Sequence, residues 1–413
     1  MRRLVLVPAF ALPVVFLAGA PIPAQPPADP TVVVRKGERK DETKGETKGE
    51  RKEEKVGIDR SGATRKRLLK DFGGSEESEE AVMLGLAWLT QMQKQDGNWE
   101  FDQGYTSDHA AATGMAVLAF LGAGQSHKEG RYKQTVQAGL DWLVRNVKIT
   151  NDRRSGEINT ISTMYSQGIA TLALCEAYGM TQDPKLKEAA QAAVNYIHHA
   201  QGRNGSWGYS YGLEGDTSIV GWQIQALHAA KLAGLTVDRR VIEKAIGFLN
   251  FVSPGQNKST YGYTDTSRAA HATSLTAVGL LCRYYVDDWR AETTGFAEGT
   301  QGLMRRAPKR GTLPPMDLYY YYYATQVVRF HGGDLWRDWN EGPLQPDGTR
   351  KGGVPEWFIS LQDRTPANRG SWAPEPGWIG RGCGRLGTTC LSLLTLEVYY
   401  RYSPEELQQP KKP

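Results

Sequence analysis

A pair of bulky apolar residues recurs six times along this chain at a nearly constant spacing. The steps between successive pairs are 54, 54, 52, 55 and 55 residues, and self-similarity at such a period is typical of a repeat architecture. The repeats therefore predict one body of six similar units rather than two or three separate domains. The pairs are Trp88-Leu89, Trp142-Leu143, Tyr196-Ile197, Phe248-Leu249, Leu303-Met304 and Phe358-Ile359.

Each period contains two helical patterns of different character. In the first unit, residues 81–92 place apolar side chains at helical spacing, whereas residues 110–121 are small and apolar almost all round. An amphipathic helix buries one face, and a helix that is apolar on every side is buried on every side. Each unit is thus predicted to hold an outer helix followed by an inner one. The matching outer and inner ranges are 189–199 and 218–232, 241–251 and 269–285, and 356–362 and 387–402.

Two layers of alternating helices can form an open superhelix or close into a ring. An open stack needs polar terminal units, and neither terminal unit of this chain is more polar than the middle ones. We therefore predict an all-α fold over residues 76–403, in which six inner helices are surrounded by six outer helices.

The turn between the two helices of a unit has a recurring sequence. Gln95-Asp96-Gly97-Asn98-Trp99 is echoed by Gln201-Gly202-Arg203-Asn204-Gly205-Ser206-Trp207 and by the segment from Gln362 to Trp372. This pattern resembles the Gln/Trp repeat of squalene and oxidosqualene cyclases, and the two-helix unit resembles that of protein prenyltransferase β subunits. The resemblance covers roughly residues 78–402. It implies an α/α toroid in which Trp99, Trp207 and Trp372 pack between neighbouring repeats.

Alternation of outer and inner helices brings every outer-to-inner turn to the same end of the ring. The N-termini of the inner helices then point to one mouth, where their unpaired N–H groups and partial positive charge predict an anion site. For Asp108, Asp216 and Asp317, helix N-capping is the alternative to a ligand role. The residues expected to line a ligand cavity are Asp108, His109, Tyr165, Trp222, Arg268, Asp317, Tyr319, Tyr323 and Arg381.

Three residues at this mouth are candidates for catalysis: Asp216, Asp265 and His271. Protein prenyltransferases bind zinc with an Asp, a Cys two residues later and a His one repeat later, and Asp216 and His271 match that layout. Ser218 replaces the thiolate, and a hydroxyl is a poor zinc ligand. Asp216 and His271 are thus vestigial metal candidates, and no cofactor is expected, with zinc as the less favoured alternative. The Asp-x-Asp-Asp motif of class II cyclases is absent, so alkene protonation by that route is not expected.

The run from Tyr319 to Tyr323 is the most unusual local feature. It predicts either close packing with hydrogen bonds between helices or an aromatic binding surface. The resemblance implies a toroid that holds an apolar or isoprenoid-type ligand in its central cavity, with catalysis undecided. Two alternatives are a non-catalytic scaffold with a protein partner and a polysaccharide-degrading toroid, which the tyrosines favour.

The N-terminal segment predicts an exported protein. Arg2 and Arg3 precede an apolar run over residues 4–17, and Ala18-Gly19-Ala20 supplies small residues for cleavage. We expect an export signal over 1–24, with an uncleaved membrane anchor as the alternative, and a periplasmic or extracellular location. Residues 25–75 and 404–413 are predicted to be disordered, because a charged, Pro-rich composition cannot bury a core.

Charge and cysteine content exclude some functions. The net charge is +5, from 50 basic and 45 acidic residues, and no basic stripe of the kind that binds nucleic acid is present. Cys175, Cys282 and Cys390 lie in apolar helical patterns, so small buried residues are expected there. Cys383 lies in the preceding loop, and in an exported protein it could pair with Cys390.

Overall fold

The structure, a computed structural model, describes residues 57–158, 163–309 and 315–401. The predicted export signal, most of the predicted linker and the predicted C-terminal tail lie outside the described residues. The described residues form helices joined by loops, with isolated β-bridges only. None of the helices in these ranges is sufficiently long and apolar to span a membrane.

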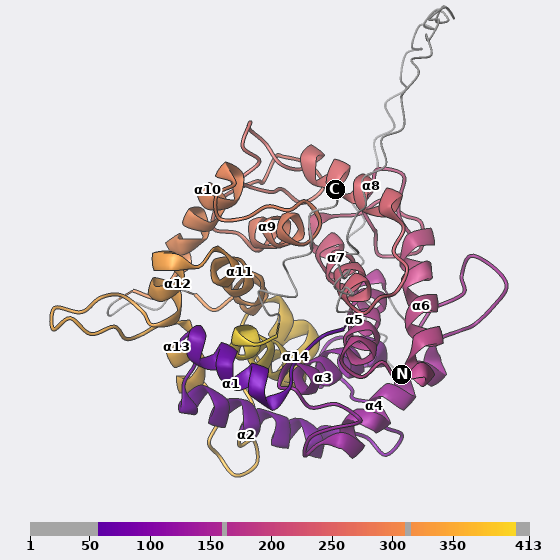
Figure 1. Ribbon diagram of the computed structural model, residues 1–413, viewed down its shortest axis with the longest axis horizontal. Helices are drawn as coiled ribbons and strands as arrows, with labels where there is room; N and C mark the ends of the chain where they lie inside the picture. Colours follow the sequence, from indigo (N-terminus) through magenta and orange to yellow (C-terminus); the bar gives the residue numbers. More distant parts are fainter. Residues whose placement is uncertain (1–56, 159–162, 310–314, 402–413) are drawn as a thin grey trace, which may run out of the picture. The chain divides into compact units, whose positions relative to one another are not determined.

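Six outer-inner helix pairs follow one another along the described chain, as predicted. The outer helices are α2 (Glu76–Met92), α4 (Lys133–Asn146), α6 (Pro184–His199), α8 (Arg239–Phe251), α10 (Thr294–Leu303) and α13 (Val354–Ser360). The inner helices are α3 (His109–Gly122), α5 (Met164–Thr181), α7 (Thr217–Leu232), α9 (Ser274–Val286), α11 (Leu318–His331) and α14 (Trp378–Leu396). A further short helix, α12 (Gly333–Asn340), joins the outer layer between α11 and α13 (Figure 1).

The inner helices form a closed ring. Each one packs against the next along the chain, and α14 packs against α3 to complete the circle. The last unit also meets the first in the outer layer, because α2 contacts both α13 and α14 (Figure 1). The predicted closure is confirmed.

Burial follows the predicted difference between the two layers. In α3, every residue from Ala110 to Gly122 is buried. In α4, burial is confined to one face, which carries Val136, Leu140 and Leu143. Each such aliphatic side chain contributes about 1.5–3 kcal/mol when it leaves water, so the outer helices are held mainly by this single stripe.

The turns link each unit to the outer helix of the next unit. Gln93 donates through Nε2 to the carbonyl oxygens of Gly97 in its own turn and Thr135 in α4, both at 2.9 Å. Gln201 makes the same pair of bonds to Gly205 and to Val241 of α8, at 3.0 and 2.8 Å. The glutamine that serves the first turn is thus Gln93, two residues before the Gln95 singled out in the sequence.

The third of these turns joins the last unit to the first. Gln362 donates to the carbonyl oxygens of Gly370 and of Ala81 in α2, at 2.9 and 2.8 Å. The ring is thus closed by the same side-chain bridge that joins consecutive units.

The three turn tryptophans are structural, as predicted. Trp99, Trp207 and Trp372 are all buried. Each donates its indole N–H to the last turn of its own outer helix, at 2.7–2.8 Å from a backbone oxygen. A buried indole needs such a partner, and here it fixes the turn against the helix that precedes it.

Several predicted boundaries are wrong. Helix α14 begins at Trp378 rather than at residue 387 and has a kink at Gly384, so Cys383 lies within it and not in the preceding loop. Helix α2 begins at Glu76 rather than at residue 81.

Helix α9 begins at Ser274 rather than at residue 269, because the Thr273 hydroxyl caps it by accepting a bond from the Thr276 N–H. Residues 62–71, placed in the disordered linker by their charge, form helix α1 (Gly62–Asp71). Tertiary contacts outweigh composition in this segment.

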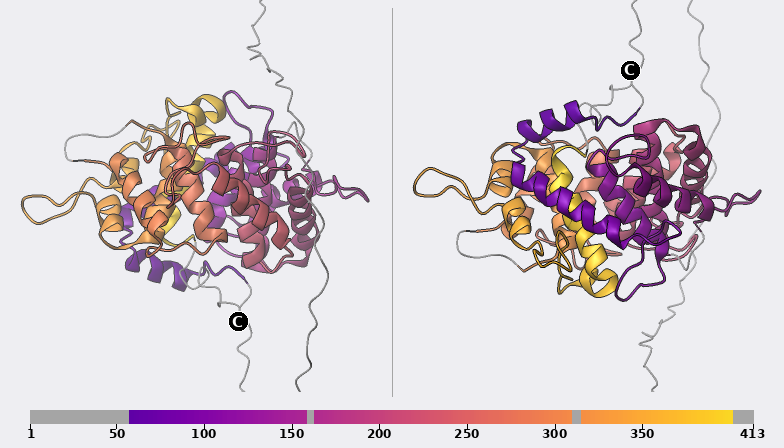
Figure 2. Two further views of the ribbon diagram at one scale, coloured as in Figure 1. Left: turned by 90° about the horizontal axis from the view of Figure 1, so that it is seen from above. Right: turned by 90° about the horizontal axis from the view of Figure 1, so that it is seen from below.

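The segment that carries α1 covers the end of the ring where the inner helices finish. The N–H groups of Gly57 and Ile58 donate to the carbonyl oxygens of Leu232 and Gly179, near the C-terminal ends of α7 and α5, at 3.1 and 3.0 Å. Seen from the side, α1 lies across that end of the ring (Figure 2).

A buried ion network holds this end closed. Glu176 of α5 accepts from Arg60 at 2.7 Å and from Arg401 at 3.0 Å, and all three side chains are almost fully buried. Breaking a buried network of this kind costs about 3–5 kcal/mol, because it leaves an uncompensated charge in the interior. The opposite end, where the inner helices begin, is where a cavity remains.

Candidate ligand cavity

A cavity of about 540 Å³ lies at the N-terminal ends of the inner helices, and all six of them contribute to its wall. The described lining residues from the inner helices and their caps are Asp108, Ala111, Met115, Thr163, Tyr165, Ile169, Ser218, Trp222, Ser274, Leu275, Tyr319, Trp378, Ile379 and Cys383. Loops add Phe101, Tyr105, Tyr209 and Tyr263. The wall is thus dominated by aromatic and aliphatic side chains, as in most small-molecule sites.

Four of the nine predicted cavity residues line this space: Asp108, Tyr165, Trp222 and Tyr319. Tyr323 lies one layer deeper, fully buried, where its hydroxyl accepts a 3.1 Å hydrogen bond from Gln225. It supports the wall instead of forming it, since its ring packs edge-on against Trp222.

The other four predicted residues lie elsewhere. His109 is beside Asn98, 2.7 Å from its amide, and stacks on Trp142 of the outer layer. Arg268 and Arg381 are exposed, and Arg381 donates to the Pro376 carbonyl. Asp317 caps α11 and pairs with Arg306 at 3.0 Å. The periodicity placed these residues at the correct rim, but their side chains turn away from the cavity.

Asp216 is the centre of a hydrogen-bond network beneath the cavity wall. It is 1% exposed and caps α7 by accepting from the N–H groups of Ser218 and Ile219 at 2.9 and 3.3 Å. The Ser218 hydroxyl donates to the same carboxylate oxygen, and the hydroxyls of Tyr165 and Ser218 lie 2.5 Å apart. Since Ser218 donates to Asp216, Tyr165 must donate to Ser218.

A second arm of the network runs through two loop tyrosines. Tyr263 lies close enough to Asp216 for the carboxylate to help raise its pKa, and the hydroxyls of Tyr263 and Tyr209 are 3.1 Å apart. Burial raises the pKa values of both Tyr165 and Tyr263, so these phenols stay protonated and act as donors. Both arms therefore lead toward Asp216.

Sequence reasoning missed the loop tyrosines, although a signal was present. Tyr209 and Tyr263 are 54 residues apart, which is the repeat period, and each follows the turn of its own unit. If the 54-residue register is applied to the turns as well as to the helices, it places Tyr209 and Tyr263 at the mouth.

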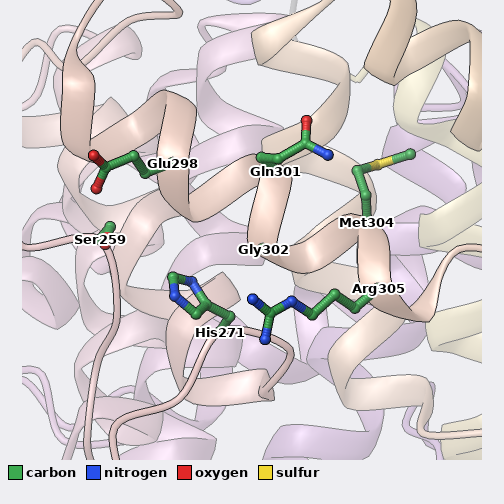
Figure 3. Close-up of a pocket in the computed structure, with 7 residues that line it drawn as sticks. All are labelled: Ser259, His271, Glu298, Gln301, Gly302, Met304 and Arg305. Atoms are coloured by element: carbon green, nitrogen blue, oxygen red, sulfur yellow. The ribbon is translucent and has the colours of Figure 1, made fainter.

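The candidate catalytic residues do not come together. Asp265 is exposed, and its pKa is lowered by hydrogen bonds from the Ser267 side chain and backbone. His271 lies in a separate surface groove of about 670 Å³, beside Gly302 of α10, with Ser259, Glu298, Gln301, Met304 and Arg305 (Figure 3). Asp216 is not in that groove.

Because Asp216 and His271 lie apart, they cannot bind one metal ion together. Within the described ranges, no group of three His, Cys, Asp or Glu side chains is arranged to hold an ion. Asp216 is occupied by Ser218 and by the start of α7, and His271 faces α10. These side chains do not fit a zinc site.

The inner-helix N-termini are largely occupied by the chain's own carboxylates. Asp108, Asp216 and Asp317 each accept from a backbone N–H in the first turn of α3, α7 and α11. Glu375 accepts from the N–H groups of Gly377 and Gly380 at the start of α14. The N-capping interpretation is thus correct for all three aspartates, and the predicted ring of open anion sites is wrong.

All four cysteines are buried and unpaired. Cys383 and Cys390 both lie in α14 and form no disulfide. Burial raises the pKa of the Cys383 thiol to about 12, so the thiol that lines the cavity is neutral and a poor nucleophile.

Comparisons with solved structures agree with the fold. An inactive variant of the α-1,6-mannanase of Salegentibacter sp. HEL1_6 in complex with α-1,6-mannotriose is 12% identical, with a TM-score of 0.50 over 78% of this chain and 99% of that chain. A variant of the type II terpene cyclase MstE from Scytonema is 12% identical, with a TM-score of 0.50 over 78% of this chain and 96% of that chain. An alpha-amylase from Clostridium perfringens is 12% identical, with a TM-score of 0.50 over 77% and 98%.

The sequence matches no protein-family model and no curated protein. At 12% identity the structural neighbours establish the architecture alone, and they differ from one another in activity. The chain is an α/α toroid, and its function must be argued from its own cavity.

Proposed function

We propose that this toroid binds an apolar, isoprenoid-like small molecule in the cavity at the N-terminal ends of its inner helices. The observation that carries the proposal is the composition of the wall: aromatic and aliphatic side chains from all six inner helices, with no Lys or Arg among the described lining residues. The resemblance to squalene cyclases and prenyltransferases supports the same ligand class. Catalysis is not part of the proposal.

The entrance is apolar as well as the interior. Tyr105, Tyr209, Tyr263 and Trp378 line the cavity and are 39–50% exposed. Tyr105 and Trp378 pack edge-to-face, with ring centroids 5.3 Å apart. Exposed aromatic side chains gathered at a cavity mouth are typical of a ligand entrance, and burying them against an apolar ligand contributes roughly 25 cal/mol per Å².

The same wall argues against an isoprenoid diphosphate. A diphosphate needs basic side chains or open helix N-termini. The described wall offers no basic side chain, and four of the six inner-helix N-termini are already bonded to carboxylates.

A carbohydrate ligand is the second candidate, and the exposed aromatic rim favours it because sugar rings stack on aromatic faces. Sugars also need many free polar partners. Here the hydroxyls of Tyr165, Tyr209 and Tyr319 are bonded to protein atoms, and Asp108 is the one charged side chain among the described lining residues. An apolar ligand therefore fits the wall better.

Titration of the purified protein with farnesol and with α-1,6-mannotriose tests the proposal, read out by the fluorescence of Trp222 and Trp378. Farnesol should bind with micromolar affinity. Leu275→Trp should weaken farnesol binding about tenfold or more, because the larger side chain fills the cavity. Leu213→Trp, on an exposed loop, is the matched control and should bind like the parent protein. Binding of mannotriose alone would establish the carbohydrate alternative, and binding of neither would favour a scaffold with a protein partner.

A further inference from the structure

The cavity wall presents aromatic rings rather than hydroxyl groups. Tyr165 donates to Ser218, Tyr209 pairs with Tyr263, and Tyr319 donates to the Ser218 carbonyl at 3.0 Å. Because these hydroxyls are already bonded to other protein atoms, the ligand meets mainly the rings. Aromatic faces carry partial negative charge and attract cations.

Two carboxylates lie at the same wall. Asp108 lines the cavity directly, and its oxygens accept from the Ser166 hydroxyl at 2.5 Å and the Ala111 N–H at 3.2 Å. Asp216 lies one hydroxyl behind the wall, bonded to Ser218. No basic side chain reaches Asp108 in the hydrogen bonds and ion pairs of the described residues. Burial raises the pKa of Asp108, and this effect outweighs the hydrogen bonds from Ser166 and Ala111 and the nearby His109, which lower it.

The positive ends of the inner-helix dipoles do not make the cavity attractive to anions. Six inner-helix N-termini contribute about +0.5 charge each, or about +3 in total. The four carboxylates that cap them, Asp108, Asp216, Asp317 and Glu375, contribute −4. Arg306, which pairs with Asp317, adds +1. The helix ends and their caps therefore cancel, and the aromatic rings leave the cavity with a preference for positive charge.

We propose that the polar end of the ligand is a cation: an ammonium group on an isoprenoid-like chain, held against the aromatic wall beside Asp108. This inference rests on the proposed function and specifies its ligand class. A desolvated cation–π contact is worth about 0.5–2 kcal/mol, and a charge-assisted hydrogen bond to Asp108 adds about 1.5–3 kcal/mol. Together they predict at least a tenfold preference for the cation.

Three probes that share one chain and differ in charge test the proposal: farnesylamine, farnesol and farnesyl diphosphate. Near pH 7, farnesylamine should bind at least tenfold more tightly than farnesol, and the diphosphate should bind most weakly. As the pH falls through the raised pKa of Asp108, the amine should lose affinity because the carboxylate takes up a proton, whereas farnesol should not. The ionisable groups around Asp108 are His109 on its own helix, Cys383 on α14, and Tyr105 and Tyr165, which line the same cavity.

Asp108→Asn is the decisive variant, because Asn caps a helix as well as Asp does and the fold should be preserved. It should bring the affinity of farnesylamine to within about threefold of the affinity that the same variant has for farnesol. Asp265→Asn, at an exposed site outside the cavity, is the matched control and should keep the full preference.

The outcomes separate the two proposals. Equal binding of farnesol and farnesylamine, or a preference that survives Asp108→Asn, overturns the cationic ligand and leaves the apolar cavity standing. Tightest binding of the diphosphate also overturns it. Failure of all three probes to bind overturns the proposed function and this inference together.

Discussion

Asp216 shows how one residue can serve the fold and the site at the same time. Its carboxylate satisfies two N–H groups at the start of α7 and accepts from the Ser218 hydroxyl, which in turn bonds to Tyr165. If the residue at position 216 only had to cap α7, Ser or Asn would serve equally well. The charge is what allows Asp216 to bind several donors and, through Ser218, to hold Tyr165 in place.

His228 is a residue whose burial makes the stability of the protein depend on pH. It is buried in α7 and stacks on Tyr285, with ring centroids 4.2 Å apart. Burial lowers its pKa to about 3, whereas the unfolded chain binds a proton near pH 6.5. Above pH 6.5 both states are neutral. As the pH falls from 6.5 toward 3, only the unfolded state takes up the proton, and folding stability is lost.

We therefore expect His228→Phe to remove part of the pH dependence of unfolding. The parent protein should lose up to about 1.4 kcal/mol per pH unit from this residue below pH 6.5, and the variant should not. Urea unfolding at pH 7.5 and 5.5 measures the difference. Exposed His199→Gln should retain the parental slope. An unchanged slope in His228→Phe would show that His228 does not resist protonation.

At the scale of the elements, the turn glycines determine how closely successive units approach. Gly205 has φ +88°, and a Cβ there would lie 2.1 Å from the Lys244 carbonyl oxygen of α8. A Cβ at Gly370 would likewise lie 2.2 Å from the Leu84 carbonyl oxygen of α2. The turn must therefore be glycine for two reasons, its left-handed backbone and its contact with the next outer helix.

A matched pair of variants separates these two reasons. Gly212 also has a positive φ, +74°, but a Cβ there would meet nothing within 4 Å. Gly212→Ala should cost about 1 kcal/mol, from backbone strain alone. Gly205→Ala should cost about 3 kcal/mol, because overpacking is added to the strain. Denaturant unfolding measures both, and equal costs would mean that α8 moves freely to accommodate the methyl group.

At the scale of the whole molecule, closure means that the toroid has no terminal repeats. In an open array each unit has neighbours on both sides except at the ends, which fray first. Here unit six bonds to unit one through Gln362 and Ala81 as unit three bonds to unit four through Gln201 and Val241. The contact between units six and one should thus contribute about as much to the free energy of unfolding as the contact between units three and four.

Gln362→Ala and Gln201→Ala test this equivalence. Each leaves two backbone carbonyls without their side-chain donor, at about 1–3 kcal/mol. The two losses should agree within about 1 kcal/mol, in a single unfolding transition. Hydrogen exchange should show reduced protection in all units of both variants. Loss of protection confined to α2, α13 and α14 in Gln362→Ala would instead identify that joint as an end that frays.

The architecture was predictable from the sequence because it depends on local periodicity. The 54-residue step, the amphipathic α4 and the uniformly apolar α3 are properties of neighbouring residues along the chain, and they predict six pairs in two layers. Closure also followed, since no unit is polar enough to serve as a cap. Asp108, Tyr165, Trp222 and Tyr319 were placed at the cavity by the same register.

What only the tertiary structure decided is which side chains face one another. His271 and Asp216 stand one repeat apart in the sequence, yet one faces α10 and the other lies under the cavity wall. The segment around α1 looks disordered by composition, but Arg60 completes a buried network with Glu176 and Arg401, which are distant in the chain. Periodicity fixes the layer and the end of the ring to which a residue belongs. The direction of a loop side chain and the partner of a buried charge depend on contacts between distant segments, and no local pattern encodes them.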